Sequence, residues 1–151
     1  MSEDYADITN KQWDDIPEVQ LLPSGSWRLR VRNASYQAAK NADQSPSVMI
    51  VYTPKEPMDD VDGEELAKLG SNYDVSANRI FTRFFVSDAS DWDRVRKHVV
   101  KHGVEVKGSI GDTLKALSGH DVVAYVGRRT FTNNAGELQE SNEAQNFASV
   151  E

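Results

Sequence analysis

The residues best suited to chemistry lie between Asn78 and Val86, where arginines alternate with aromatic side chains. Successive side chains of a β-strand point to opposite faces. One face of a strand here would carry core residues and the other would carry arginines and rings: Ile80, Thr82, Phe84 and Val86 against Arg79, Phe81, Arg83 and Phe85. Arginine neutralises phosphate and rings stack on any base, so the second face suits a single-stranded nucleic acid. A strand buried on both faces, with paired or solvated arginines, would show the same alternation.

Two other segments carry a similar pattern. Ser26 to Arg32 alternates apolar residues with Arg28, Arg30 and Arg32. This arginine face is either a solvated outer face, which antiparallel sheets commonly have, or a second basic stripe. Asp121 to Thr132 also reads as a strand and adds Tyr125, Arg129 and Phe131 to the basic and aromatic set.

The sequence motifs give little support to a catalytic site or a metal-binding site. His98 and His102 have the i, i+4 spacing that can hold a metal on a helix, but the catalytic glutamate of the zinc peptidase pattern is missing between them. A solvated helix face is the favoured interpretation of this pair. No serine sits on a glycine-flanked elbow, and no glycine-rich loop precedes a helix in a phosphate-binding pattern. We therefore expect no enzyme, no metal site and no cofactor.

Composition indicates one intracellular domain. At 151 residues the chain has room for a single core. The absence of cysteine excludes a disulfide framework and fits a reducing cytoplasm. No apolar run approaches the roughly 18 residues that cross a bilayer, and the first residues lack the features of a signal peptide. A soluble, cytoplasmic protein that does not bind membranes is expected.

The net charge of −7 is unevenly distributed. Residues 1–19 hold six acids against Lys11, and residues 56–65 hold six acids and no base. Residues 26–55 hold five bases against Asp43 alone. Acid therefore lies in the flanks and loops while base lies in the predicted strands, and a negative total does not exclude a positive groove.

The pattern of elements predicts a mainly β domain. Strands are expected at 26–32, 47–53, 78–86, 121–132 and 138–150, with Pro54 ending the second. Helices are expected to begin at a Ser90 cap and at a Ser109 cap, and to end at Gly103 and Gly119. An acidic, loosely ordered segment (1–20) would precede a single domain (21–151). The long acidic loop at 54–77 is either solvated or a flap that competes with DNA.

Five strands with a helical insertion between the third and fourth match the oligonucleotide/oligosaccharide-binding (OB-fold) barrel. A twisted sheet with helices on one face is the competing architecture. Three segments, Leu22–Val31 (LPSGSWRLRV), Arg79–Phe85 (RIFTRFF) and Leu117–Val126 (LSGHDVVAYV), followed by 142–147, resemble phage-encoded single-stranded DNA-binding proteins.

This resemblance implies an OB-fold, no cofactor, and largely sequence-independent binding of single-stranded DNA during phage replication or recombination, in the host cytoplasm. Many such proteins end in an acidic tail that recruits partners, whereas residues 146–151 carry one acid. The acidic amino-terminal segment could take that role, and a homo-oligomer is possible. The predicted contacts are the basic and aromatic residues of the strands: Arg28, Arg30, Arg32, Tyr36, Tyr52, Arg79, Phe81, Arg83, Tyr125, Arg129 and Phe131. The alternatives are a structural or adaptor barrel without nucleic-acid binding and, more distantly, an acidic inhibitor or DNA mimic.

Overall fold

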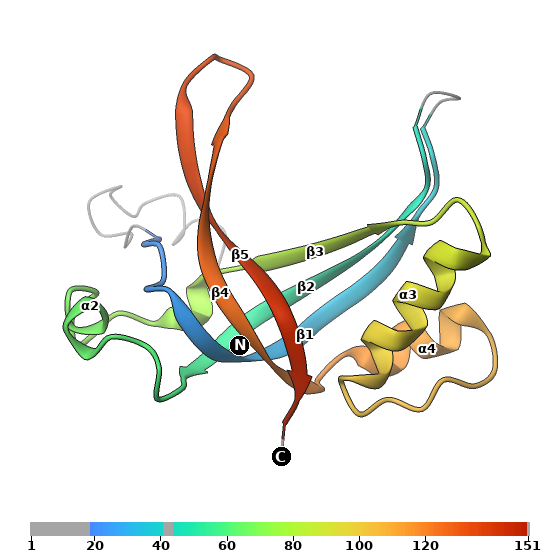
Figure 1. Cartoon of the computed structure of the whole chain (residues 1–151), viewed down its shortest axis with the longest axis horizontal. Coiled ribbons are helices and arrows are strands. Elements are labelled where there is room, and N and C mark those ends of the chain that lie inside the picture. Colours follow the sequence, from blue (N-terminus) through green and yellow to red (C-terminus); the bar gives the residue numbers. More distant parts are fainter. Residues whose placement is uncertain (1–18, 41–43, 151) are drawn as a thin grey trace, which may run out of the picture.

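A computed structural model describes residues 19–40 and 44–150, which form one five-stranded antiparallel sheet in the order β3-β2-β1-β4-β5 (Figure 1). The strands are β1 (Gly25–Gln37), β2 (Ser47–Pro57), β3 (Ile80–Phe85), β4 (Asp121–Thr132) and β5 (Leu138–Ser149). The helices are α2 (Gly63–Ala67), the 3₁₀ turn η2 (Val75–Ala77), α3 (Ala89–Val100) and α4 (Ile110–Leu117).

The five predicted strands and the helical insertion between the third and fourth are confirmed. The predicted closed barrel is not: β3 and β5 contact each other but share no hydrogen-bonded ladder, so the sheet stays open between them. Most of the predicted acidic segment (residues 1–18) lies outside the described residues.

The first two strands are both longer than expected, and in β2 a bulge accommodates Pro54. Pro54 does not end β2 but is buried within it. The register with β1 shifts there, since Leu29 pairs with Pro54 while Arg28 pairs with Glu56. A bulge absorbs the missing amide donor of proline without breaking the ladder. Together the two strands form the long central ribbon of the sheet (Figure 1).

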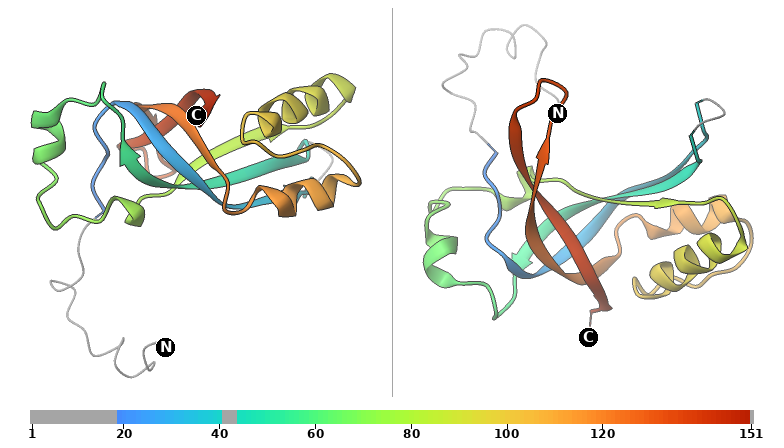
Figure 2. Two further views of the ribbon diagram at one scale, coloured as in Figure 1. Left: turned by 90° about the horizontal axis from the view of Figure 1, so that it is seen from below. Right: turned by 45° about the horizontal axis from the view of Figure 1, so that its top comes forward.

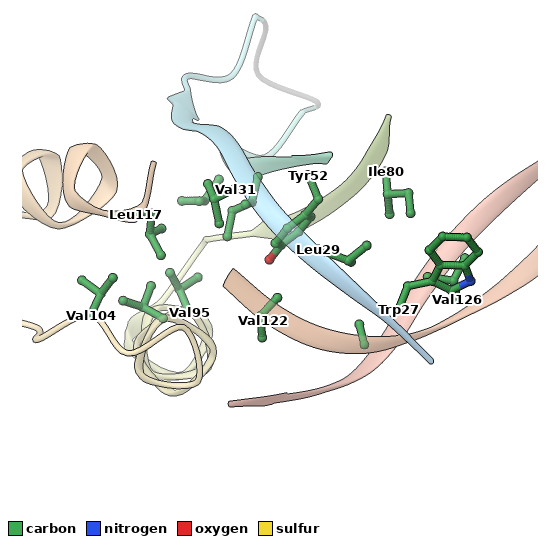
Figure 3. Close-up of a cluster of buried hydrophobic side chains, with 14 of the residues drawn as sticks. Trp27, Leu29, Val31, Tyr52, Ile80, Val95, Val104, Leu117, Val122 and Val126 are labelled. Carbon is green, nitrogen blue, oxygen red and sulfur yellow. The ribbon is translucent and has the colours of Figure 1, made fainter. Parts of the chain in front are cut away.

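One face of the sheet is buried with the helical insertion (Figure 3). The core takes alternate residues from the strands and is completed by residues of α3, α4 and the connection between them: Trp27, Leu29, Val31, Val48, Ile50, Tyr52, Ile80, Val86, Val95, Val99, Val104, Leu114, Leu117, Val122, Ala124 and Val126. The predicted core positions Ile80 and Val86 are confirmed, and Phe84 packs against this cluster while partly buried.

Both long helices lie at one end of the sheet and α2 lies at the other (Figure 2). Helix α3 begins at an Asp88 cap, whose side chain accepts from the Asp91 amide, and not at the expected Ser90. Asp88 stands immediately before the first helical residue, where its side chain can accept from a free amide of the first turn. Ser90 already lies within the helix and is therefore past the cap position. The predicted Ser109 cap of α4 is confirmed, with its hydroxyl accepting from the Asp112 amide.

The acids of the 54–77 loop hold the loop together. Asp60 accepts from the amide and hydroxyl of Ser26 at 2.8 and 2.9 Å, and these bonds lower the pKa of that carboxyl. Asp62 caps α2 and Asp74 caps η2. The loop also packs tightly on the start of β1, because a Cβ added to Gly25 (φ 145°) would lie 2.6 Å from Val61 Cγ2. The sequence left two interpretations of this loop, a solvated connection or a flap that competes with DNA. Its internal hydrogen bonds and its packing on β1 favour the solvated connection.

An irregularity in β5 turns Phe147 into the core. Val123 pairs with Ala148 while Tyr125 pairs with Gln145, so β5 has two residues between these pairs where β4 has one. One of them, Asn146, adopts a positive φ of 55°. The left-handed conformation is one that asparagine tolerates better than most residues. The distortion brings the Phe147 ring within 5.4 Å of the Tyr52 ring, between centroids.

This conformation predicts that Asn146→Val destabilises the protein by about 1–2 kcal/mol, because a β-branched residue is strained in the left-handed region. Urea denaturation measures the difference. Asn146→Gly should be neutral or slightly stabilising, and Gln145→Val, at an exposed neighbouring position, should change the free energy of unfolding little. Equal effects of valine at both positions would contradict the assignment of strain to residue 146.

Candidate nucleic-acid interface

A groove runs along the outward side of β3, between that strand and the β4–β5 hairpin. In Figure 1 the hairpin and the distal ends of β1 and β2 project upward, flanking β3 on either side. The groove is lined by basic and aromatic side chains of β3, by β2, and by the hairpin: Met49, Arg79, Phe81, Thr82, Arg83, Phe85, Arg129, Ser141, Asn142, Glu143 and Ala144. The open edge of the sheet therefore brings together four of the residues that the sequence singled out, namely Arg79, Phe81, Arg83 and Arg129.

The orientation of β3 follows from its pairing with β2. Phe81 pairs with Val51, Arg83 with Met49, and Phe85 with Ser47. Directly paired residues of an antiparallel ladder share a face. Burial of the opposite face therefore leaves Phe81 and Phe85 57% and 55% exposed. Phe85, which the sequence placed on this face but which the predicted contact set omitted, lies in the groove with Phe81.

A second hollow continues the groove toward the ends of β1 and β2. It is lined by Gln37, Ala38, Lys40, Gln44, Ser45, Ser47, Arg83 and Phe85, so it shares its last two residues with the first hollow. Arg83 Nη2 lies 3.5 Å from Gln37 Oε1 and 3.9 Å from Met49 Sδ. Lys40, which the sequence-based set omitted, adds a cation here. Lys40 follows the end of β1, so no strand alternation in the sequence placed it beside β3.

The charge of this continuous surface is predominantly positive. Arg79, Arg83, Arg129 and Lys40 line it, and Glu143 is its one acidic lining residue among those described. None of the four cations forms a salt bridge with a described carboxylate. Within the described residues, Arg79 donates only to the backbone carbonyls of Ser76 and Asn78. Cations that lack an acidic partner within the described chain can bind an external anion without losing an internal ion pair.

The arginines of β1 have a different environment. Arg30 Nε lies 2.7 Å from Asp121 Oδ1, and Arg28 pairs with both Asp121 and Glu56. The two guanidinium groups lower the pKa of the Asp121 carboxyl, and Asp121 in turn raises the pKa of Arg30. These arginines are outward-facing, as predicted, but their charge is largely balanced and neither lines the groove. Arg32, at the β1 bulge, is exposed and also lies outside it.

Four predicted aromatic contacts also lie outside the groove. The Tyr36 ring stacks on Trp92 with 6.2 Å between centroids, and Tyr125 and Phe131 are exposed along β4. The prediction for Tyr52 is wrong, because this residue is fully buried. Its β2 position lies on the inner face, and a continuous apolar run gives no alternation from which to assign faces.

Tyr52 instead joins a buried cluster with two histidines. Its hydroxyl oxygen lies 2.8 Å from Nε2 of both His98 and His102, and His102 Nδ1 lies 2.8 Å from the His98 carbonyl. A carbonyl only accepts, so His102 carries its proton on Nδ1 and accepts from Tyr52 at Nε2. His98 Nε2–H then donates to the tyrosine oxygen. The prediction of a solvated His98–His102 face is therefore wrong: burial among aromatic rings excludes it.

The aromatic neighbours of this cluster connect three elements. The His98 ring lies 4.8 Å from Phe84 of β3 and 4.5 Å from Phe147 of β5, between centroids. Burial lowers the pKa of His98 to about 3, lowers the pKa of His102, and raises the pKa of the Tyr52 hydroxyl. Both imidazoles are therefore neutral at physiological pH. Helix α3 is thus fixed to β2, and β3 and β5 pack on the same cluster.

Within residues 19–40 and 44–150, no three histidine, cysteine or carboxylate side chains come together in an arrangement that could hold a metal ion. Among the described helices, none is long and apolar enough to cross a membrane. No protein-family model and no curated protein matches this chain.

The neutral histidines predict a loss of stability in weak acid. An unfolded histidine has a pKa of about 6.5, whereas the pKa of His98 in the fold is about 3. Between these values the unfolded state binds more protons, so the free energy of unfolding falls as pH decreases. From pH 7 to pH 5 it should drop by about 2 kcal/mol from His98 alone, measured by urea denaturation.

The His120→Ala variant provides a control, because His120 is exposed and lies outside the cluster. It should lose the same stability over this interval as the parent protein. A free energy of unfolding that stays constant between pH 7 and pH 5 would contradict a neutral, buried histidine pair.

Proposed function

We propose that this protein binds single-stranded DNA, largely without sequence preference, in the groove along β3. The observation that carries the proposal is the groove lining itself. Two half-exposed rings, Phe81 and Phe85, alternate with Arg79 and Arg83, and Arg129 stands on the opposite wall. Stacking on an aromatic ring contributes about 1–3 kcal/mol per base, and arginines bind the phosphates between the bases.

The spacing of the rings suits a single strand. Residues four apart in a β-strand are about 13 Å apart, so bases stacked on the two rings would be separated by a short length of extended backbone. The arginines alternate with these rings along the same edge. Each arginine would therefore lie near a phosphate that connects the stacked bases. Among the helices of the described residues, none projects toward the groove in a way that would enter a duplex major groove (Figures 1 and 2).

The polar lining gives little opportunity to read base edges. Asn142 has the amide group best suited to that role, but both of its side-chain atoms are occupied. Its Oδ1 accepts from the Leu22 amide at 2.9 Å, and its Nδ2 donates to the carbonyls of Leu22 and Gly127. Binding through phosphates and stacked rings, without strong sequence preference, follows from this arrangement.

The strand order supports an OB-fold opened along one seam. Strand β1 pairs with both β2 and β4, the helical insertion separates β3 from β4, and the two edge strands approach each other. An OB barrel has this connectivity with its last seam closed. Together with the resemblance in the segments around 22–31, 79–85 and 117–126, it supports a role in phage DNA replication or recombination, with partner proteins recruited through the acidic amino-terminal segment.

An adaptor role is the second candidate, favoured by an apolar pocket between α3 and α4. The pocket is lined by Trp92, Val95, Val99, Val106, Ile110 and Leu114, together with Arg96, Gly108, Ser109 and Thr113. Ile110 is 53% exposed at its rim. A partner protein could bury this surface. An adaptor of this kind would form a stable complex and would not bind oligonucleotides.

Fluorescence anisotropy with a labelled oligo-dT distinguishes the two functions. We expect binding at low salt that weakens as salt increases, with a log–log slope of about −2 if three arginines contact phosphates. Absence of binding at low salt, or affinity indifferent to salt, would exclude the proposed function and leave the adaptor role.

Point variants test the location of the site. Phe81→Ala should weaken oligo-dT binding by about 1–3 kcal/mol, and Arg83→Ala should weaken it and reduce the salt slope. The matched controls are Phe131→Ala, an exposed ring outside the groove, and Arg96→Ala, an exposed arginine on α3. Both should bind like the parent protein. Loss of affinity in the controls, with Phe81→Ala unaffected, would move the site to another face.

A further inference from the structure

The pocket between α3 and α4 combines an apolar lining with an exposed apolar rim. Its volume is about 220 Å³, and Trp92, Val95 and Leu114 are among its lining residues. An apolar cavity of about 150 Å³ already binds benzene, so this pocket can hold a large apolar side chain. Ile110 and Val106 also line it and are 53% and 40% exposed. Exposed apolar residues gathered around a pocket are typical of an interaction site.

This pocket lies in a positively charged part of an acidic chain. Residues 89–119 hold six lysines and arginines against four carboxylates, although the whole chain has a net charge of −7. Arg96 lines the pocket, and its Nη1 lies 3.7 Å from the Asp93 carboxylate, which Lys97 approaches more closely, at 3.0 Å. An exposed guanidinium with a long surface ion pair can bind a second carboxylate at little cost. The pocket therefore suits an apolar side chain with an acid beside it.

The opposite end of the molecule presents such a pair of side chains. Met58 and Asp59 lie between β2 and α2 in the chain, and α2 is at the end of the sheet away from α3 and α4 (Figures 1 and 2). Met58 is 38% exposed, and Asp59 is exposed as well. Asp59 forms no salt bridge with a described residue. Around them, residues 56–65 hold six carboxylates and no base.

The turn that carries Met58 and Asp59 is fixed to the start of β1. The Met58 amide donates to the Ser26 carbonyl at 2.9 Å, and the Asp60 carboxylate accepts from the amide and hydroxyl of Ser26. Because these bonds already order the turn, little conformational entropy is lost when it binds another surface.

Methionine matches the lining of the pocket in shape and in chemistry. Its unbranched thioether adapts to irregular apolar surfaces, and its sulfur makes favourable contacts with aromatic rings. Trp92 supplies such a ring in the pocket. With Met58 inserted, the next residue in the chain, Asp59, would lie within reach of Arg96. Opposite charges on the two surfaces would also favour this orientation over others.

We propose that copies of this chain associate head to tail, with Met58 of one copy in the α3–α4 pocket of the next and Asp59 beside Arg96. The complementary surfaces lie at opposite ends of one molecule, so each added copy leaves one surface of each kind open and the assembly grows as an open chain. A contact of this size is weak and forms at high protein concentration. The inference goes beyond the proposed function, because the contact needs no DNA.

Sedimentation velocity without DNA tests the association. We expect the average sedimentation coefficient to rise past that of a dimer as the protein concentration increases from about 10 μM to about 1 mM. The rise should shrink at about 0.5 M salt, where charges are screened within a few ångströms. A protein that stays monomeric at the highest concentration would overturn the proposal and leave the pocket to a different protein. Association that stops at the dimer would overturn the open chain.

Two variants that each lose one surface give a sharper test. M58S/D59K alters the turn and I110D alters the pocket, and all three side chains are exposed, so the fold should persist. Each variant alone should associate at least about tenfold more weakly than the parent protein. An equimolar mixture should form dimers and nothing larger, because the intact turn of one variant fits the intact pocket of the other. A mixture that does not dimerise would overturn the proposal.

Matched controls lie on the β4–β5 hairpin, where Glu137 and Leu138 are exposed. L138S/E137K repeats the charge change of the turn variant, and L138D repeats that of the pocket variant. Both should associate like the parent protein. Equal losses in the controls would attribute the effect to net charge or to exposed apolar area, and would overturn the proposal. If the protein does not bind oligo-dT, the proposed function fails, and the sedimentation results still decide whether copies associate in this way.

Discussion

Burial of one face of the sheet is the constraint on which the rest of this structure depends. Because side chains alternate along a strand, seating Ile80 and Phe84 against the core forces Phe81, Arg83 and Phe85 outward. A slip of one residue in the β2–β3 register would exchange the two sets. The apolar residues that stabilise the fold thus also determine the composition of the groove.

The helical insertion depends on a polar contact inside this core. Tyr52 of β2 bridges His98 of α3 and His102 of the turn that follows it, and rings of β3 and β5 pack on the same cluster. Buried polar groups without partners cost several kcal/mol, so a fully paired set favours one arrangement of helix on sheet. Phe147 reaches the cluster because β5 is distorted at Asn146. This packing holds β5 near the β3 edge although no ladder joins them.

Electrostatics divides the molecule into functional regions despite its net charge of −7. Some charges are used internally: Asp121 balances Arg28 and Arg30, and the loop acids cap helices. The groove cations have no described acidic partner. In such a molecule the local potential, and not the sum of charges, governs which ligand binds.

Local patterns in the sequence determined the strands, the helical insertion and the Arg/aromatic alternation of β3, because period-two burial and helix caps depend on near neighbours. They also determined the outward direction of Arg28 and Arg30. Tertiary structure alone decided that Asp121, some 90 positions away, neutralises those arginines, that Tyr52 and both histidines are buried together, and that Lys40 and Arg129 join the β3 residues in one groove. Each of these facts depends on the register of paired strands and on the open β3–β5 seam. Strand pairing unites residues that no local pattern relates.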